Sequence, residues 1–227
     1  MSFARRKGGA ELSRRHILDT AARLFRESGY AAVSLRSIAA ACDMKAGSLY
    51  YHFESKDEIV LEILRLGVEH VYLAVRTAVD ALGPEVPPQQ RIATAVETHL
   101  RVLLELQDYT SANIRIFGQV PRAVRERHIG LRDEYEAFWT SLLRRYLKDS
   151  GQGGRRSLAM TRFFLIGAMN STLEWYRPAG QPIRSVAREL TRILLHGLHG
   201  ATTEPVAKRR LSRPSAGSPG PNRLAAG

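Results

Sequence analysis

The sequence predicts an all-α protein in which a small three-helix N-terminal domain precedes a larger helical domain. Three observations support this prediction: apolar residues recur at helical spacing along most of the chain, alternating strand patterns are absent, and capping residues separate the apolar repeats. The chain has 227 residues and 44% of them are hydrophobic, so it is long enough to bury a core.

The first predicted helix begins at the cap residue Ser13 and ends at Gly29, the residue type that helix ends favour. Its apolar residues share one face: Ile17, Ala21, Leu24 and Phe25. Ser34 then caps a short second helix whose stripe ends at Cys42. A turn at residues 43–45 leads into a third helix over residues 46–51. Two short helices joined by such a turn are typical of a helix-turn-helix unit.

A capping box predicts the start of the fourth helix. Ser55 can accept a hydrogen bond from the third backbone N–H of the helix, while Glu58 reaches back. This helix extends to about residue 82, before a proline-containing break. The outward side of the third helix carries polar and aromatic residues where a core helix would carry apolar ones, as expected of a side that contacts DNA bases.

Positive charge is concentrated at the two ends of the chain. The net charge is +12, and residues 1–15 and 203–227 each contain five basic residues and one acidic residue. We expect residues 1–15 to form a basic flexible arm. The segment 203–227 is rich in Pro, Gly and Ser and has few large apolar residues, which predicts a disordered basic tail. A basic balance favours polyanionic partners such as nucleic acid, but does not specify one.

Several protein classes are disfavoured by composition. The longest apolar run, Phe163 to Met169, is far shorter than the roughly 20 residues that span a bilayer. The single cysteine, Cys42, excludes an intramolecular disulfide framework and a cysteine-rich zinc site. Neither a glycine-rich phosphate loop nor a nucleophile elbow is present, and the seven histidines form no metal-ligand pattern. We therefore expect a soluble cytoplasmic protein that is not an enzyme, with no membrane, metal or cofactor.

Residues 14–64 resemble the DNA-binding domain of the TetR family of transcriptional regulators. The resemblance lies in A-x-x-L-F-x-x-x-G-Y of the first helix, the Ile-Ala pair of the second, and G-S-L-Y-Y-H-F-x-S-K-D from Gly47 to Asp57. It implies a helix-turn-helix DNA-binding domain over residues 16–60, which reads a palindromic operator as a homodimer. The residues that it assigns to DNA are Ser34, Arg36, Lys45, Ala46, Ser48, Tyr50, Tyr51, His52 and Lys56.

Two residues depart from the family pattern. Asp43 replaces the turn glycine; it tolerates a left-handed backbone but adds negative charge near DNA. Lys45 replaces the serine cap of the third helix and cannot cap, but adds a cation at the groove. Alternatives remain open at two of the assigned positions: Tyr50 as half core, and His52 as a capping or packing residue. Cys42 fits the apolar stripe of the second helix, which favours a small buried hydrophobe over a redox sensor. The basic residues 5–7 are either unstructured or enter a minor groove.

The remaining helices are predicted near residues 89–106, 108–118, 122–148, 156–176 and 183–199, within a domain over residues 61–202. The resemblance implies that this domain binds an effector and dimerises through its last two helices. Small and apolar residues at helical spacing on these helices are compatible with pairing, although they could also serve the core of one subunit. The predicted interface residues are Phe164, Ala168, Ser171, Trp175, Leu190, Leu194 and Leu198.

A second, weaker resemblance concerns the effector. The segments F-L-I-G-A-M-N-S-T-L-E-W-Y-R-P-A-G and R-E-L-T-R-I-L-L-H-G-L are similar to a TetR subgroup that regulates fatty-acid and steroid catabolism. This suggests an acyl-CoA thioester or a lipid-like acid in a mostly apolar pocket. The fourth helix is the expected lever between pocket and DNA. Candidate pocket residues are Ile114, Arg115, Phe117, His128, Arg132, Tyr135, Phe138, Trp139, Phe163 and Met169.

We therefore predict a homodimeric, effector-responsive repressor. The alternatives are a transcriptional activator of the same fold and a protein that binds polyanions nonspecifically through its basic ends. Equal affinities for a palindromic operator and random DNA would favour the nonspecific protein.

Overall fold

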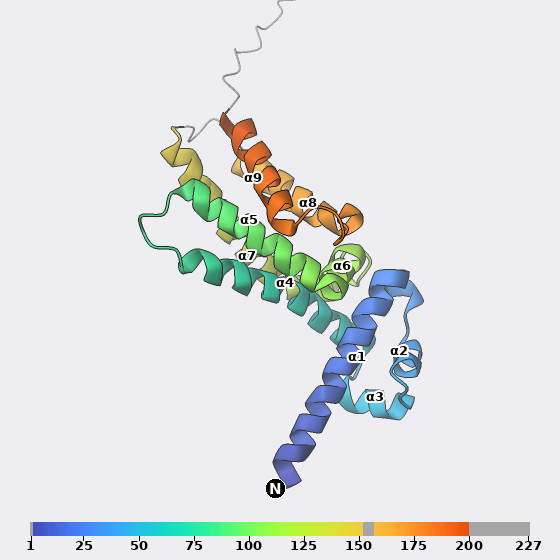
Figure 1. Ribbon diagram of the computed structural model, residues 1–227. Helices are drawn as coiled ribbons and strands as arrows, with labels where there is room; N and C mark the ends of the chain where they lie inside the picture. The colour runs from blue at the N-terminus through green and yellow to red at the C-terminus, as the bar shows by residue number, and fades with distance from the viewer. Residues whose placement is uncertain (1, 152–156, 200–227) are drawn as a thin grey trace, which may run out of the picture.

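The computed structural model describes residues 2–151 and 157–199, and this part of the chain is entirely helical between its loops, which confirms the predicted fold class (Figure 1). The helices are α1 (Ser2–Ala32), α2 (Leu35–Ala41), α3 (Ala46–His52), α4 (Lys56–Asp80), α5 (Pro88–Glu105), α6 (Gln107–Ile116), α7 (Arg122–Asp149), α8 (Leu158–Trp175) and α9 (Ile183–His199).

The N-terminus differs from the expected flexible arm. Helix α1 begins at Ser2, so residues 2–15 continue the helix that the caps had placed from Ser13 onward. No proline precedes Pro84, so nothing in this segment removes a backbone donor from the helix. The predicted tail over residues 203–227 lies outside the described residues.

Gly29 marks a kink near the end of α1. Its φ of 80° and ψ of 174° are non-helical, as expected of a glycine that interrupts a helix. A Cβ atom at this position would lie 2.9 Å from Oε1 of Gln119, in the loop between α6 and α7. The backbone conformation favours glycine here, whereas the flexible end of the Gln119 side chain can move aside at low cost.

One hydrophobic cluster holds the N-terminal helices together. Its largest fully buried members include Phe25 of α1, Leu49 of α3 and Phe53, which follows α3. The cluster continues past residue 60 of α4 and takes in Ala112 and Ile116 of α6. The helix-turn-helix region therefore shares its core with helices that come later in the chain.

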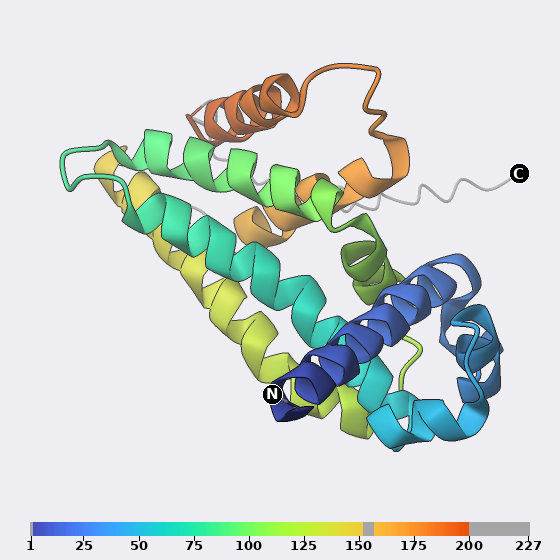
Figure 2. The ribbon, with the colours of Figure 1, turned by 60° about the horizontal axis from the view of Figure 1, so that its bottom comes forward.

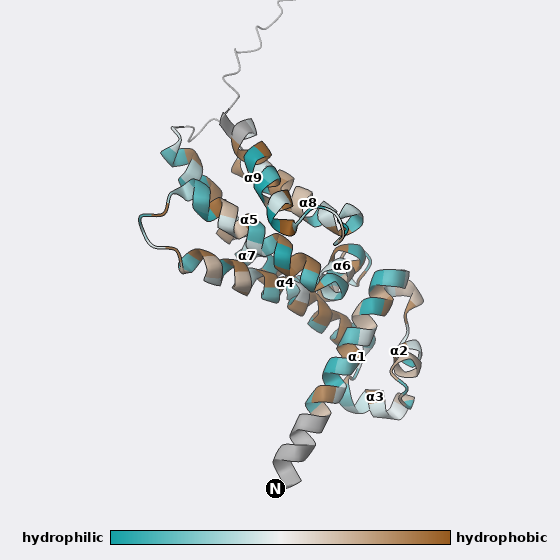
Figure 3. Cartoon of the chain, in the orientation of Figure 1, coloured by the Kyte–Doolittle hydropathy of each residue, from teal (hydrophilic) through white to brown (hydrophobic). Residues whose placement is uncertain are grey.

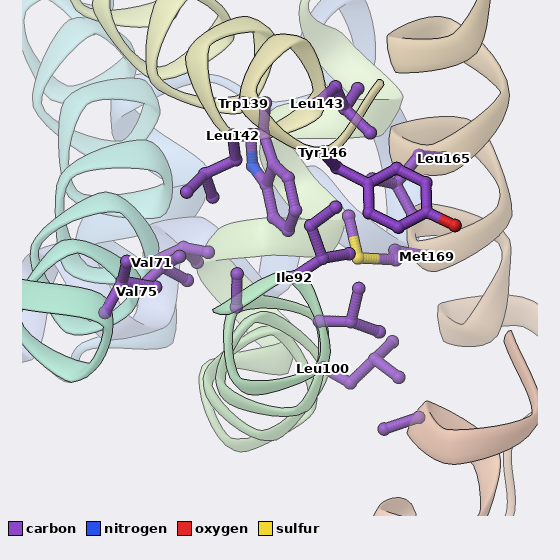
Figure 4. Packing of buried hydrophobic residues seen from close by; sticks show 14 of the residues in the cluster. Val71, Val75, Ile92, Leu100, Trp139, Leu142, Leu143, Tyr146, Leu165 and Met169 are labelled. Carbon is purple, nitrogen blue, oxygen red and sulfur yellow. The ribbon is translucent and has the colours of Figure 1, made fainter. Parts of the chain in front are cut away.

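A second cluster fills the space between α4, α5, α7, α8 and α9. Trp139 is fully buried in it beside Ile92, Leu100 and Met169 (Figure 4). Helix α5 packs against α4 on one side and α9 on the other, and α8 packs against α5 and α7 (Figure 2). None of the helices in the described ranges is long and apolar enough to cross a membrane.

Helix α4 belongs to both clusters: Ile63 and Leu64 lie in the N-terminal one, and Val71 and Val75 in the C-terminal one. Between these pairs, α4 passes close to α6 at Gly67. A Cβ atom there would lie 2.9 Å from the backbone oxygen of Tyr109, so the absence of a side chain permits this approach.

Candidate nucleic-acid interface and internal cavity

The turn between α2 and α3 is built by local capping. Ser34 and Ser37 exchange hydrogen bonds at the start of α2, with Oγ of Ser34 accepting from the N–H of Ser37 at 3.1 Å. After α2, Asp43 adopts a φ of 54°, the left-handed conformation predicted for the turn. The Met44 N–H then donates to the Ala39 oxygen at 2.9 Å. The serine bonds therefore fix the start of α2, while the Asp43 conformation and the Met44 bond form the turn that leads to α3.

Helix α3 buries one side and exposes the other. Leu49 is fully buried, whereas the side chain of Tyr51 is 82% exposed and that of Tyr50 is 54% exposed. Tyr50 is therefore not the half-core residue that the alternative interpretation expected. Lys45, Ala46 and Ser48 are also exposed, and Lys45 makes no capping hydrogen bond. His52 is half-buried, with its ring edge-on to that of Tyr51.

The two predicted DNA contacts at the start of α2 are both exposed. The hydroxyl of Ser34 serves as the cap of α2, so its first role is structural. Arg36 makes no hydrogen bond or ion pair within the described part of the chain, which leaves its guanidinium available to a phosphate.

Lys56, which the resemblance assigns to DNA, has its ammonium group directed at the protein. Its ammonium group donates to the backbone oxygens of Tyr30 and Val33, both at 3.0 Å, and lies 3.8 Å from the centre of the Tyr30 ring. The Tyr30 hydroxyl donates to Asp57 at 2.7 Å, and burial together with this carboxylate raises the pKa of Tyr30 to about 12. Lys56 therefore joins the start of α4 to the end of α1.

Arg14 was missed by the sequence analysis. Its Nη1 donates to the backbone oxygen of His52 at 2.7 Å, and its guanidinium lies 4.0 Å from the centre of the Phe53 ring. Its Nη2 is 3.6 Å from a carboxylate oxygen of Glu58. Arg14 thereby caps the last turn of α3, where a cation is favourable. Its position in a basic segment gave no signal that distinguished it from its neighbours.

Polar contacts connect α1 to α6 and to the loop after it. The Tyr109 hydroxyl donates to Asp19 at 2.6 Å, and Arg26 forms an ion pair with Asp108 at 2.7 Å. The Tyr30 N–H donates to Oε1 of Gln119 at 3.0 Å, next to the kink in α1. Burial and Asp19 raise the pKa of Tyr109, which therefore keeps its proton as the donor. Two hydrogen bonds and one ion pair thus join α1 to α6 and to the loop after it.

A cavity of about 290 Å³ lies between α4, α5, α6, α7 and α8. Four of the predicted pocket residues line it: Ile114, Phe117, Arg132 and Tyr135. Its polar lining also includes residues that the prediction missed, because single polar residues in apolar helix patterns are equally compatible with a core. These are His99, Thr110, Asn113, Glu136 and Asn170.

The other six predicted pocket residues lie away from the cavity lining. Trp139 and Met169 are fully buried in the C-terminal cluster, and Phe138 packs against the same cluster beside Tyr72. Phe163 is 58% exposed on α8, and Arg115 is exposed. His128 is buried next to Asn113, with its ring edge-on to Phe117.

Two partly exposed charged residues, Arg132 and Glu136, line the cavity. The guanidinium of Arg132 stacks over the Phe117 ring at 4.2 Å and lies 3.9 Å from Glu136. Glu136 makes a shorter ion pair with Arg162 at 2.6 Å. Because Arg162 takes up much of the charge of Glu136, the guanidinium of Arg132 remains available to an anionic group.

Helices α8 and α9 carry many apolar residues (Figure 3), and several of these are exposed. Phe164 is 71% exposed and Trp175 is 51% exposed, although large apolar side chains usually avoid water. Among the other predicted interface residues, Ser171 is exposed, whereas Ala168, Leu190 and Leu194 are half-buried. The side chain of Leu198 lies outside the described part of the chain. Further exposed apolar residues on these helices are Met160, Phe163 and Ile193.

Among the residues that the structure describes, no group of three or more histidine, cysteine or acidic side chains could hold a metal ion. The exposed α3 side chains, carried by two short helices and a tight turn, define a helix-turn-helix DNA-binding protein. Residues 17–63 match the family described as "Bacterial regulatory proteins, tetR family". Residues 85–198 match "Tetracyclin repressor-like, C-terminal domain". The chain belongs to the TetR family of transcriptional regulators.

Individual relatives agree with this assignment. The chain is 29% identical to the HTH-type transcriptional repressor KstR2 of Rhodococcus jostii, over 82% of this chain and 90% of the relative. The crystal structure of the regulator PfmR from Thermus thermophilus is similar, with a TM-score of 0.68 and 28% identity over 79% of this chain and 97% of that one. AibR, solved with isovaleryl coenzyme A and operator DNA, shares the fold with a TM-score of 0.66 and 22% identity, over 80% and 97% of the two chains.

Proposed function

We propose that the protein is a cytoplasmic homodimeric repressor that binds a palindromic operator through α3. The observation that carries the proposal is the outward side of α3, where Lys45, Ser48 and Tyr51 are exposed beside the free guanidinium of Arg36. Lysine and serine can bond phosphates or base edges, and tyrosine can reach phosphates or thymine methyl groups. The relative KstR2 of Rhodococcus jostii is a repressor, which supports repression over activation.

The apolar surface of α8 and α9 supports pairing of two copies. Exposed Phe164, Trp175 and Ile193 form the kind of apolar surface that a twofold interface buries. Pairing would place two α3 helices on one duplex, where half-sites one helical turn apart need a separation of about 34–36 Å.

Replacing Lys45 tests whether the exposed side of α3 contacts DNA. We expect Lys45→Ala to weaken operator binding by about 1–3 kcal/mol and, if the ammonium meets a phosphate, to reduce the salt dependence by about one counterion. The measurement is fluorescence anisotropy with a duplex selected from a random library, titrated with salt. Lys148→Ala, an exposed lysine at the end of α7, is the matched control and should bind like the parent protein. Equal affinity for selected and random duplexes would contradict specific recognition.

The cavity is the proposed effector site, and its occupant an acyl-CoA thioester or a lipid-like acid. Val68, Val71 and Leu103 give it apolar walls, and Arg132 provides a cation for a carboxylate or phosphate. The relative AibR is solved with an acyl-CoA and operator DNA, which supports this class of effector. In the proposed mechanism the effector binds the DNA-free arrangement more tightly, and so releases the operator.

Helix α6 connects this cavity with the DNA-binding helices. Thr110, Asn113 and Ile114 of α6 line the cavity, while Tyr109 and Asp108 of the same helix hold α1. The sequence pointed to the fourth helix as the lever, and α4 also lines the cavity, at Val68 and Val71. The contacts of α6 provide a second connection between the cavity and α1.

A series of acyl-CoA thioesters of increasing chain length tests the effector class. We expect at least one to raise the Tm of the protein, because a ligand that binds only the folded state stabilises it, and to release the selected operator. Free coenzyme A is the control for contacts outside the acyl group. If no thioester or free fatty acid changes either quantity, the effector part of the proposal is wrong.

A further inference from the structure

Helix α3 has few interactions that hold it against the rest of the protein. It has seven residues, and a helix this short does not persist in water by itself. Leu49 is its one buried side chain, and Lys45 makes no side-chain cap at its start. Contacts at its other end, next to the buried residue Phe53, therefore help to decide where its exposed side points.

Arg14 of α1 makes three contacts at this end. Its Nη1 donates to the backbone oxygen of His52 at 2.7 Å, and its guanidinium lies 4.0 Å from the centre of the Phe53 ring. Its Nη2 lies 3.6 Å from Oε1 of Glu58, whose Oε2 accepts from the N–H of Glu54 at 2.8 Å. One side chain of α1 thus reaches the end of α3, the connection after it and the first turn of α4.

Two of these contacts are of a strong kind. The last carbonyl oxygens of a helix lack partners within the helix and carry partial negative charge, and the oxygen of His52 is one of them. A charged donor at 2.7 Å makes a stronger hydrogen bond with it than a neutral donor would. The Phe53 ring is 1% exposed, so water competes little for the cation above it.

The ion pair with Glu58 contributes less. The two side chains are 37% and 40% exposed, and ion pairs in water contribute little to stability. The carbonyl bond and the ring contact are therefore the main interactions of Arg14.

Together, these two contacts restrict the end of α3. A guanidinium is planar, and its N–H groups have fixed directions relative to its face. When one edge bonds an oxygen and the face covers a ring, the oxygen and the ring can lie in few positions. The oxygen of His52 and the ring of Phe53 belong to adjacent residues, so Arg14 restricts the direction of α3 relative to α1.

We propose that Arg14 is a positioning residue for operator recognition, which holds α3 in the orientation that the major groove requires and does not itself contact DNA. The inference rests on the proposed function of α3 and adds a residue of another helix to it. Contacts with base edges need a correctly oriented α3, whereas a random sequence is bound mainly through its phosphates. Loss of Arg14 should therefore weaken binding to the operator more than binding to random DNA.

The test compares Arg14→Gln with the parent protein on a selected duplex and a random duplex, by fluorescence anisotropy over a range of salt concentrations. We expect the ratio of the two affinities to fall about tenfold or more, the effect of one mismatched base pair. The salt dependence should stay the same, because no phosphate contact is lost.

Arg26→Gln is the matched control. Arg26 is also an arginine of α1, its side chain is 32% exposed, and it pairs with Asp108 of α6 instead of contacting α3. This variant loses the same charge and should keep the affinity ratio of the parent protein. Arg14→Lys keeps the cation and one donor but not the planar fork, and should restore part of the ratio.

Hydrogen exchange of the free protein, measured by mass spectrometry, gives a readout that does not need DNA. In Arg14→Gln the backbone amides of residues 46–53 should exchange faster than in the parent protein, while those of α5 exchange as before. Arg26→Gln should leave the exchange of residues 46–53 unchanged.

Three outcomes would overturn the inference. One is an affinity ratio that Arg14→Gln leaves unchanged, and another is exchange of residues 46–53 at the parent rate. The third is an equal loss for both duplexes with a salt dependence reduced by about one counterion, which would mean that Arg14 binds a phosphate itself. A parent protein that binds both duplexes equally would instead disprove the proposed function of α3, and hydrogen exchange would still decide whether Arg14 holds this helix.

Discussion

Phe164→Glu is expected to convert the protein from a dimer into a monomer. Phe164 is 71% exposed on α8, and a twofold axis would bring the substituted carboxylate into the interface twice. An unpaired carboxylate removed from water costs several kcal/mol, enough to raise the dimer dissociation constant about a thousandfold or more. Sedimentation equilibrium at micromolar concentration measures the change.

Operator binding should weaken when dimerisation is lost. In a dimer, the second α3 helix binds at a high effective concentration once the first is bound. A monomer lacks this gain, so we expect its operator affinity to drop about a hundredfold or more. Leu73→Glu is the matched control: Leu73 is 52% exposed on α4, outside the α8 and α9 surface, and should leave a dimer. A Phe164→Glu protein that stays dimeric and binds the operator normally would show that the subunits pair elsewhere.

Acidification is expected to destabilise the protein before its carboxylates titrate. Burial lowers the pKa of His99 and of His128 from 6.5 to about 4, with the charge of Arg132 adding to the effect at His128. Between these values the unfolded chain binds more protons than the folded one, so stability is complete above pH 6.5 and falls as the pH drops toward 4. At pH 5 the loss is about 2 kcal/mol for each histidine.

Urea denaturation at pH 7.5 and pH 5 measures this loss as a difference in the free energy of unfolding. His128→Gln should remove about half of the pH dependence, because it removes one of the two histidines whose pKa burial lowers in the described part of the chain. His70→Gln changes an exposed histidine of α4 and should leave the pH dependence as it is. A free energy of unfolding that is the same at both pH values would contradict the burial of these rings.

The helix-turn-helix region was predictable because its determinants are local. Ser34 and Ser55 cap the helices that their own sequence neighbours form, and Asp43 takes the left-handed turn conformation expected of it. The hydrogen-bond partners of Lys56 depend instead on where the carbonyl oxygens of Tyr30 and Val33 lie after folding. No spacing in the sequence encodes that distance.

The cavity lining was harder to predict for a different reason. Helix α8 carries apolar residues on nearly every side, so periodicity does not separate exposed Phe163 from buried Met169. His99 occupies a single position in the apolar stripe of α5, where a polar residue fits either a core or a ligand site. Whether His99 lies in the core or at a ligand site is decided only by how helices α4 to α8 pack around it.

The core shared between the N-terminal helices and α6 limits how such a regulator can be rebuilt. Excising residues 16–60 would strip Phe25 and Phe53 of apolar neighbours from α4, α6 and α7, since Ile63, Ile116 and Val124 belong to the same cluster. The DNA-reading part is therefore not an independent module. To give this chain a new operator preference, only the outward residues of α3 should be substituted. The inward residues of α3 should keep their native identity.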